Sequence, residues 1–147
     1  MMSLKLLLAL ALVAVVTGSQ EFEVGARRRR EVCAEHSNGC SIPGDLPFFY
    51  KNTFTPACDR HDMCYNCGSL LGYTKDQCDQ YFLNNMLKIC ASVRRRRDTL
   101  SRKYRSTCTL TATVYYEGVH LAGASHFRVP GHTDPYCTTD LVRTCVP

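Results

Sequence analysis

A histidine and an aspartate lie side by side at positions 61 and 62, within the stretch Ala-Cys-Asp-Arg-His-Asp-Met-Cys. The imidazole of His61 titrates close to neutral pH, so it can take a proton from water. The carboxylate of Asp62 offers the oxygen ligands that calcium prefers. Adjacent residues of a helix point about 100° apart, so the two side chains can flank one site and do different jobs there. The alternative is a polar pair held between two structural cysteines.

A third carboxylate, Asp79, lies on the apolar side of a predicted helix. That helix begins after a capping box formed by Thr74 and Gln77, and its apolar residues recur at three- and four-residue steps: Cys78, Phe82, Met86, Ile89 and Cys90. A carboxylate on such a face either needs a partner or lies at a solvated rim. Asp79 could accept a ring N–H of His61 and fix its tautomer. With a cation to polarise a substrate carbonyl, the three residues would make a calcium-assisted hydrolase.

The elements on either side of His61 are predicted from their turn and cap residues. Residues 38–55 are rich in turn formers and predict a loop whose carbonyl oxygens could reach the same cation. Pro56 suits a first helical turn and Thr55 an N-cap, which predicts a helix over 56–67 that ends near Gly68. The aromatic residues at the end of the loop could line an acyl channel, touch lipid or belong to the core: Phe48, Phe49, Tyr50 and Phe54.

The last third of the chain gives mixed signals. Residues 108–123 have strand propensity, but they also carry a helical stripe that ends at Gly123, and these two patterns disagree. The residues after them read as loop.

The ends of the chain and its basic runs predict processing. Residues 1–19 read as a secretory signal peptide, which implies an oxidising environment for the ten cysteines. Arginine runs at 27–30 and 94–97 and a third basic cluster, Arg102-Lys103-Tyr104-Arg105, read as convertase sites. Cleavage there would release a propeptide, 20–30, and excise a spacer, 94–105. A long chain, 31–93, and a short chain, 106–147, would remain; the alternative is an uncut basic surface loop.

Cysteine counts and charge sharpen this division. The long segment holds seven cysteines and the short segment three, so complete pairing requires at least one disulfide between them. The precursor has a net charge of +5, whereas the two retained segments carry −3 and −1. Strong electrostatic attraction to nucleic acid or to anionic lipid is therefore not expected of the processed protein. A zinc or redox site at Cys64-x-x-Cys67 and an insulin-like two-chain hormone are the rival interpretations.

The residues around His61 resemble a known family. The Cys58-x-x-His61-Asp62-x-Cys64 pattern looks like the active-site helix of secreted phospholipases A2, and Asn-Gly-Cys-Ser at 38–41 followed by a Pro- and Phe-rich loop resembles their bacterial and fungal-type branch. The helical patterns from Cys78 and from Cys108 are also similar to that branch. The arrangement of two chains split by arginine runs resembles the conodipines, the phospholipases A2 of cone-snail venom.

The resemblance implies roles for five residues. His61 would be the general base and Asp79 its partner. Asp62 would bind calcium through its carboxylate, Asn38 through its side-chain oxygen and Gly39 through its carbonyl. The bacterial-type pattern has Asp where Asn38 stands, which implies weaker calcium binding here. A disulfide between Cys40 and Cys58 is expected, because it would tie the calcium loop to the catalytic helix.

The resemblance also implies the fold and activity. We expect an all-α, disulfide-rich fold with two antiparallel catalytic helices and a third helix, 108–123, from the second chain. The expected function is calcium-dependent hydrolysis of the sn-2 ester of glycerophospholipids by a secreted venom enzyme that meets its substrate at a membrane or micelle surface. The alternative is a catalytically weak or inactive binding toxin on the same scaffold.

Overall fold

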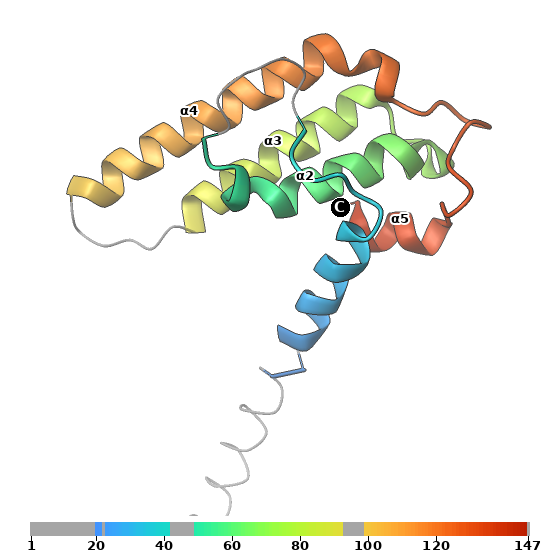
Figure 1. Cartoon of the computed structure of the whole chain (residues 1–147), viewed down its shortest axis with the longest axis horizontal. Helices are drawn as coiled ribbons and strands as arrows, with labels where there is room; N and C mark the ends of the chain where they lie inside the picture. The colour runs from blue at the N-terminus through green and yellow to red at the C-terminus, as the bar shows by residue number, and fades with distance from the viewer. Residues whose placement is uncertain (1–19, 22, 42–48, 93–98, 147) are drawn as a thin grey trace, which may run out of the picture.

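The computed structural model describes residues 20, 21, 23–41, 49–92 and 99–146, which form helices and contain no strand. A helix over 23–34 comes first. The labelled elements then follow in chain order: α2 (Lys51–Cys67), η1 (Gly68–Leu71), α3 (Lys75–Ser92), α4 (Thr99–Ala122), η2 (Gly123–His126) and α5 (Thr139–Cys145). In Figure 1, α2 and α3 run antiparallel and α4 lies along α3. The expected all-α architecture is therefore confirmed.

The helix that carries His61 begins earlier than the sequence predicted. It starts at Lys51 with Tyr50 as N-cap, and Pro56 lies inside it. The prediction of a start at 56 with Thr55 as N-cap was wrong: the Thr55 hydroxyl instead donates to the Lys51 carbonyl, at 3.0 Å. Burial of Phe54, which is fully enclosed, helps to offset the backbone hydrogen bond that Pro56 cannot make. The predicted end is confirmed, with Gly68 as C-cap.

The next two helices follow their apolar stripes. The Gln77 side chain accepts the Thr74 N–H at 2.9 Å and the Thr74 hydroxyl accepts the Gln77 N–H at 3.3 Å, so the predicted capping box is formed. In α4 the helical stripe prevails over strand propensity, because Cys108, Ala112 and Tyr115 are buried against α2 and α3. This helix starts at Thr99, inside the segment predicted to be excised.

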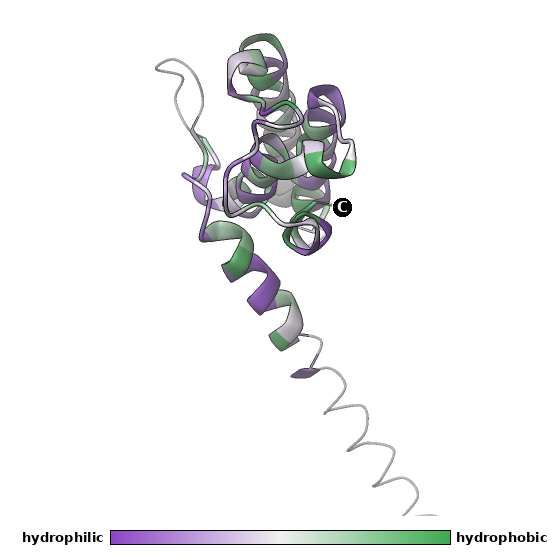
Figure 2. Cartoon of the chain, turned by 90° about the vertical axis from the view of Figure 1, so that its right-hand side faces the viewer, coloured by the Kyte–Doolittle hydropathy of each residue, from purple (hydrophilic) through white to green (hydrophobic). Residues whose placement is uncertain are grey.

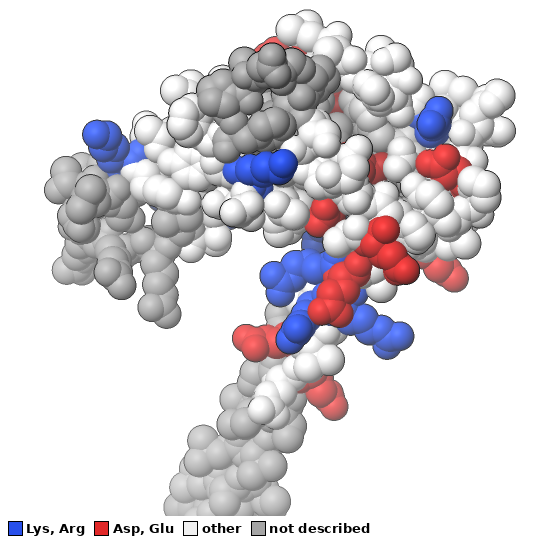
Figure 3. Space-filling model, in the orientation of Figure 1, with Lys and Arg blue, Asp and Glu red and all other residues white. Residues whose placement is uncertain are grey.

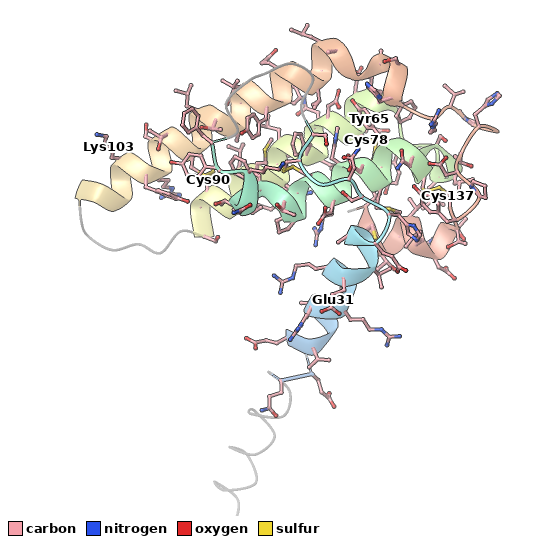
Figure 4. All side chains as sticks on the ribbon, viewed as in Figure 1. Glu31, Tyr65, Cys78, Cys90, Lys103 and Cys137 are labelled. Atoms are coloured by element: carbon pink, nitrogen blue, oxygen red, sulfur yellow. A yellow bond between two sulfur atoms is a disulfide. The ribbon has the colours of Figure 1, made fainter. Side chains whose placement is uncertain are left out.

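Five disulfides hold these helices together. Two lie within the long segment, and one of them is the expected Cys40–Cys58 bond. Cys64 also pairs within that segment, and Cys67 pairs across the spacer, so the Cys64-x-x-Cys67 motif is not a metal or redox pair. All three cysteines of the short segment bond to the long one: Cys33–Cys145, Cys67–Cys137 and Cys90–Cys108. Figure 4 shows how far apart Cys78, Cys90 and Cys137 lie along the body.

The C-terminal residues are more ordered than the sequence predicted. Expected as loop, they contain the short helix α5, whose N-cap Thr138 accepts the Leu141 N–H. Its Val142 is fully buried in a second core with Met63 and with the Cys33–Cys145 disulfide. The correction has a physical reason, because pairings between distant cysteines fix this segment and cannot be deduced from spacing.

The loop aromatics differ in burial. Phe54 is in the core and packs edge-on against Tyr115, whereas the Phe49 side chain is 65% exposed. Phe48 lies outside the described residues, as do the predicted signal peptide and residues 94–98 of the spacer.

The helix over 23–34 projects from the body in both ribbon views (Figures 1 and 2). Charged side chains gather on it, while the face of the body seen in Figure 3 carries scattered charges. The predicted cleavage site after Arg30 falls within this helix, and that cleavage stays a prediction.

Candidate active site

The structure brings His61 and Asp79 together from two antiparallel helices. The His61 Nε2 atom lies 3.0 Å from Asp79 Oδ1. His61 is 7% exposed and Asp79 is fully buried. The imidazole also lies between two rings, with centroids 4.1 Å from that of Tyr65 and 4.6 Å from that of Phe82. The carboxylate on the apolar stripe therefore has a partner in a largely dry environment.

Asp79 has more partners than the sequence predicted. Its Oδ1 atom accepts a second hydrogen bond from the Tyr65 hydroxyl at 2.6 Å, and its Oδ2 atom accepts one from Lys75 Nζ at 2.7 Å. The His120 Nδ1 atom lies 3.3 Å from the same Oδ2. Burial alone would raise the pKa of Asp79, but the hydrogen bonds from His61, Lys75 and Tyr65 outweigh it and lower the pKa to about 2.

This environment fixes the tautomer of His61. An ionised carboxylate only accepts hydrogen bonds, so the proton of the neutral imidazole must be on Nε2, which faces Asp79. The Nδ1 atom is then left with its lone pair, and His61 lines an open cleft. The geometry is that of a general base held in one orientation by a buried acid.

Three of these neighbours were missed by sequence reasoning. Tyr65 follows His61 by four residues and Lys75 precedes Asp79 by four, so helical spacing could have placed both beside the pair. His120 carries no such signal, because its position depends on how α4 docks. Burial and the hydrogen bond to Asp79 raise the pKa of Tyr65, so its hydroxyl remains a donor.

The three predicted calcium ligands lie together: Asp62 on α2, and Asn38 and Gly39 on the loop that precedes it. The Asp62 Oδ2 atom accepts hydrogen bonds from the Ser37 hydroxyl at 2.8 Å and from the Asn38 backbone N–H at 3.2 Å. Gly39 has a φ of +73°, a conformation that suits glycine, and it places its carbonyl beside the Asn38 amide. The Cys40–Cys58 disulfide anchors this loop to α2.

The donor set fits a hard cation. One terminal atom of the Asn38 amide lies 3.1 Å from each of three oxygens: Asp62 Oδ2, the Gly39 carbonyl and Ser41 Oγ. With nitrogen in that position, the amide donates to these oxygens. The oxygens of Asp62, the Gly39 carbonyl and the Asn38 amide are of the type that calcium prefers. Burial raises the pKa of Asp62, partly offset by the Ser37 hydrogen bond, so the carboxylate would gain from a positive partner.

A second group of possible metal ligands involves the buried acid itself. Ligand atoms of Asp76, Asp79 and His120 lie within 4.8 Å of one another. The Lys75 ammonium already contacts Asp79 there, at 2.7 Å, and would repel a metal ion. None of the predicted calcium ligands belongs to this group.

His61 and two of the predicted calcium ligands, Asn38 and Asp62, line the same cleft, which has a volume of about 470 Å³. From the long segment it is lined by His61, Asp62 and Asn38, among others, and from the short segment by Val119, Gly123, Ser125, His126 and Arg128. Both sides of the predicted spacer therefore contribute to one cavity. None of the described helices is long and apolar enough to cross a membrane.

Comparison with known proteins identifies the fold family. The family model for prokaryotic phospholipase A2 matches residues 16–123, which include His61, Asp62 and Asp79. The chain belongs to this family. Within it, Conodipine-P3 of Conus purpurascens is 33% identical over 155 residues, which cover 79% of this chain and 81% of the relative. The Conodipine-M alpha chain of Conus magus is 44% identical over 62 residues, or 42% of this chain and 78% of the relative. No solved structure matches.

Membership of the phospholipase A2 family disfavours the rival classes. A two-chain hormone would need no buried acid–base pair, and the zinc interpretation loses its cysteines to disulfides. The family match ends at residue 123, so the part of the cleft wall formed by Ser125, His126 and Arg128 lies beyond it.

Proposed function

We propose that this protein is a secreted, calcium-dependent phospholipase A2 that hydrolyses the sn-2 ester of glycerophospholipids. The observation that carries the proposal is the buried His61–Asp79 pair beside a loop of oxygen ligands, both at one cleft. Phospholipid at a membrane or micelle surface would be the substrate, and the membrane a transient partner.

His61 would act first in the proposed reaction. Its Nδ1 lone pair takes a proton from a water molecule in the cleft as the oxygen of that water attacks the ester carbonyl. Asp79 stabilises the imidazolium that forms, because its ionised carboxylate faces Nε2 at 3.0 Å. His61 then gives the proton to the departing lysophospholipid oxygen, which releases the fatty acid and restores the base. The rings of Phe82 and Tyr65 pack against the imidazole and help to hold it in place.

Asn38, Gly39 and Asp62 would hold calcium. The bound ion would supply positive charge to polarise the ester carbonyl and to offset the charge that develops on its oxygen. The loop is prepared for this by the Ser37 hydroxyl, which fixes Asp62, and by the disulfide that anchors Cys40.

A catalytically weak binding toxin on the same scaffold is the second candidate. One observation favours it: Asn38 is neutral where the bacterial-type pattern carries a carboxylate, which removes a charge from the cation site. The intact His61–Asp79 pair weighs against it, since a pure binding protein gains nothing from a buried, four-partnered carboxylate.

The two-chain form and secretion belong to the same proposal. Three disulfides cross the predicted spacer, so excision of 94–105 would leave the chains covalently joined. The alpha chain named in the Conus magus relative supports such a form. Mass spectrometry of the secreted protein, before and after reduction, should show one species that separates into two; a single mass after reduction would contradict cleavage.

Fatty-acid release from phosphatidylcholine vesicles tests the function. We expect release from vesicles labelled at sn-2 but not at sn-1, dependent on calcium and abolished by chelator. Replacing His61 with Gln should reduce release by about 10²–10⁴-fold, the usual contribution of a general base. No release from folded, processed wild-type protein would favour the binding toxin, and release from sn-1 would contradict the proposed specificity.

A further inference from the structure

Lys75 occupies an unusual place beside the buried acid. It is the first residue of α3, and its side chain is 18% exposed. Its ammonium group donates to Asp79 Oδ2 at 2.7 Å and to the His120 backbone carbonyl at 2.8 Å. His120 lies in the last turn of α4, where carbonyls lack helical partners and the helix dipole is negative. The Lys75 ammonium thus links Asp79 on α3 to the C-terminal end of α4.

We infer that Lys75 is a positioning residue. It holds the Asp79 carboxylate in the orientation that meets His61, and through its bond to the His120 carbonyl it connects the end of α4 to the catalytic pair. The inference rests on the proposed function. It would give the short segment a role in turnover that is separate from its contribution to stability.

The division of donors between the two carboxylate oxygens supports this role. His61 and Tyr65 donate to Oδ1, whereas Lys75 and His120 face Oδ2. Rotation of the Asp79 carboxylate about its Cβ–Cγ bond would break both sets together. Lys75 carries a positive charge and contacts Oδ2 more closely than His120 does, so it restrains that rotation from one oxygen while the Tyr65 hydroxyl, at 2.6 Å, restrains it from the other. The orientation of the imidazole then depends on Lys75 through Asp79.

Local helix stability explains a lysine here only weakly: its i,i+4 ion pair with Asp79 stabilises α3, and its position at the start of the helix offsets that gain. A cation at the first residue of a helix meets the positive end of the helix dipole, which disfavours it. Lys75 also lies outside the set of residues that line the cleft, so a direct contact with substrate is not its role. Loss of Lys75 should therefore lower kcat and leave KM nearly unchanged.

The test compares Lys75→Ala with Lys88→Ala, a matched change at an exposed lysine of the same helix. We expect Lys75→Ala to lower kcat by about 10- to 100-fold, as misplacement of a catalytic group does, with KM within about twofold of wild type. Added ethylammonium should restore part of kcat in Lys75→Ala alone, because it supplies the missing cation to a partly open site. A purely structural role would not respond to the amine.

A spectroscopic readout keeps the test independent of turnover. The Nε2 proton of His61, held by Asp79, should give a downfield proton resonance that is absent in His61→Gln. This resonance should shift or broaden in Lys75→Ala and remain in Lys88→Ala. An unchanged resonance with unchanged kcat would overturn the inference and leave the proposed function standing. An inactive wild type would overturn the proposed function, and the resonance alone would then decide whether Lys75 positions Asp79.

Discussion

Two aspartates near His61, Asp79 and Asp62, differ in burial, in hydrogen-bond partners and in the direction of their pKa shift. Asp79 is fully buried, with four donor groups around its two oxygens, and its pKa is lowered to about 2. Asp62 is less buried, and its hydrogen bonds within the described part of the chain all go to Oδ2. Burial raises its pKa. Among the described residues, Asp79 therefore has hydrogen-bond partners on both carboxylate oxygens, whereas the partners of Asp62 lie on one oxygen.

This difference separates two kinds of chemistry. A carboxylate that supports a proton transfer must keep its charge and orientation without help from solvent, so its partners are side chains of the protein. A carboxylate that binds a cation must keep an oxygen available, and its pKa falls when the ion binds. We therefore expect changes around Asp79 to lower turnover and changes around Asp62 to lower calcium affinity. The following experiments test whether the two effects can be separated.

The largest expected effect comes from removing the loop disulfide. In the uncleaved chain, replacing Cys40 and Cys58 with Ser should lower the free energy of unfolding by about 3 kcal/mol, from the entropy of a loop of this length. It should also weaken calcium binding, because the ligand loop loses its anchor. Replacing Cys90 and Cys108, a pair with the same separation of 18 residues, is the control. It should cost similar stability and leave calcium affinity unchanged; equal losses of calcium affinity in both variants would contradict an anchoring role for Cys40–Cys58.

The acid dependence of stability should report the state of Asp79. Because its folded pKa lies below the ordinary value, ionised Asp79 stabilises the fold above about pH 4, and this stabilisation is lost as the pH falls toward 2. The loss should amount to about 2 kcal/mol in denaturant titrations at these pH values. The Asp79→Asn variant should lack this component. Asp62→Asn should retain it, since the raised pKa of Asp62 acts in the opposite direction.

A smaller effect is expected where the short segment touches Tyr65. A methyl group on Gly123 would lie 2.5 Å from the Tyr65 hydroxyl and 3.1 Å from its ring. Gly123→Ala should therefore displace Tyr65 from Asp79, lower turnover and cost about 1.5 kcal/mol of stability. Its effect on turnover should be much smaller in a Tyr65→Phe background, because the hydrogen bond to Asp79 is already gone. Full additivity of the two changes would show that Gly123 acts elsewhere.

Most of the helical architecture could be predicted from the sequence. Capping residues and apolar periodicity are local, so Thr74, Gln77 and the stripe that contains Asp79 gave the start and the buried face of α3. The start of α2 was mispredicted because Pro56 is tolerated inside a helix whose neighbours are well packed. The order of the C-terminal residues was missed, because it depends on disulfides to distant cysteines.

The site divides in the same way. The position of Asp79 on an apolar face already required a partner, and the structure places His61 there. Lys75 and Tyr65 each lie four residues from a member of the pair and could have been deduced from helical geometry. His120 and the residues at 125–128 reach the site only through the docking of α4, which no local pattern encodes.

The most direct test is to measure calcium binding and turnover together in Asp62→Asn and Asp79→Asn. Calorimetric titration would give the calcium affinity, and vesicles labelled at sn-2 would give the turnover at saturating calcium. We expect Asp79→Asn to bind calcium like the wild type and to lose most of its turnover, while Asp62→Asn loses calcium binding. Normal turnover in Asp79→Asn, or unchanged calcium affinity in Asp62→Asn, would contradict the separate roles assigned to the two carboxylates.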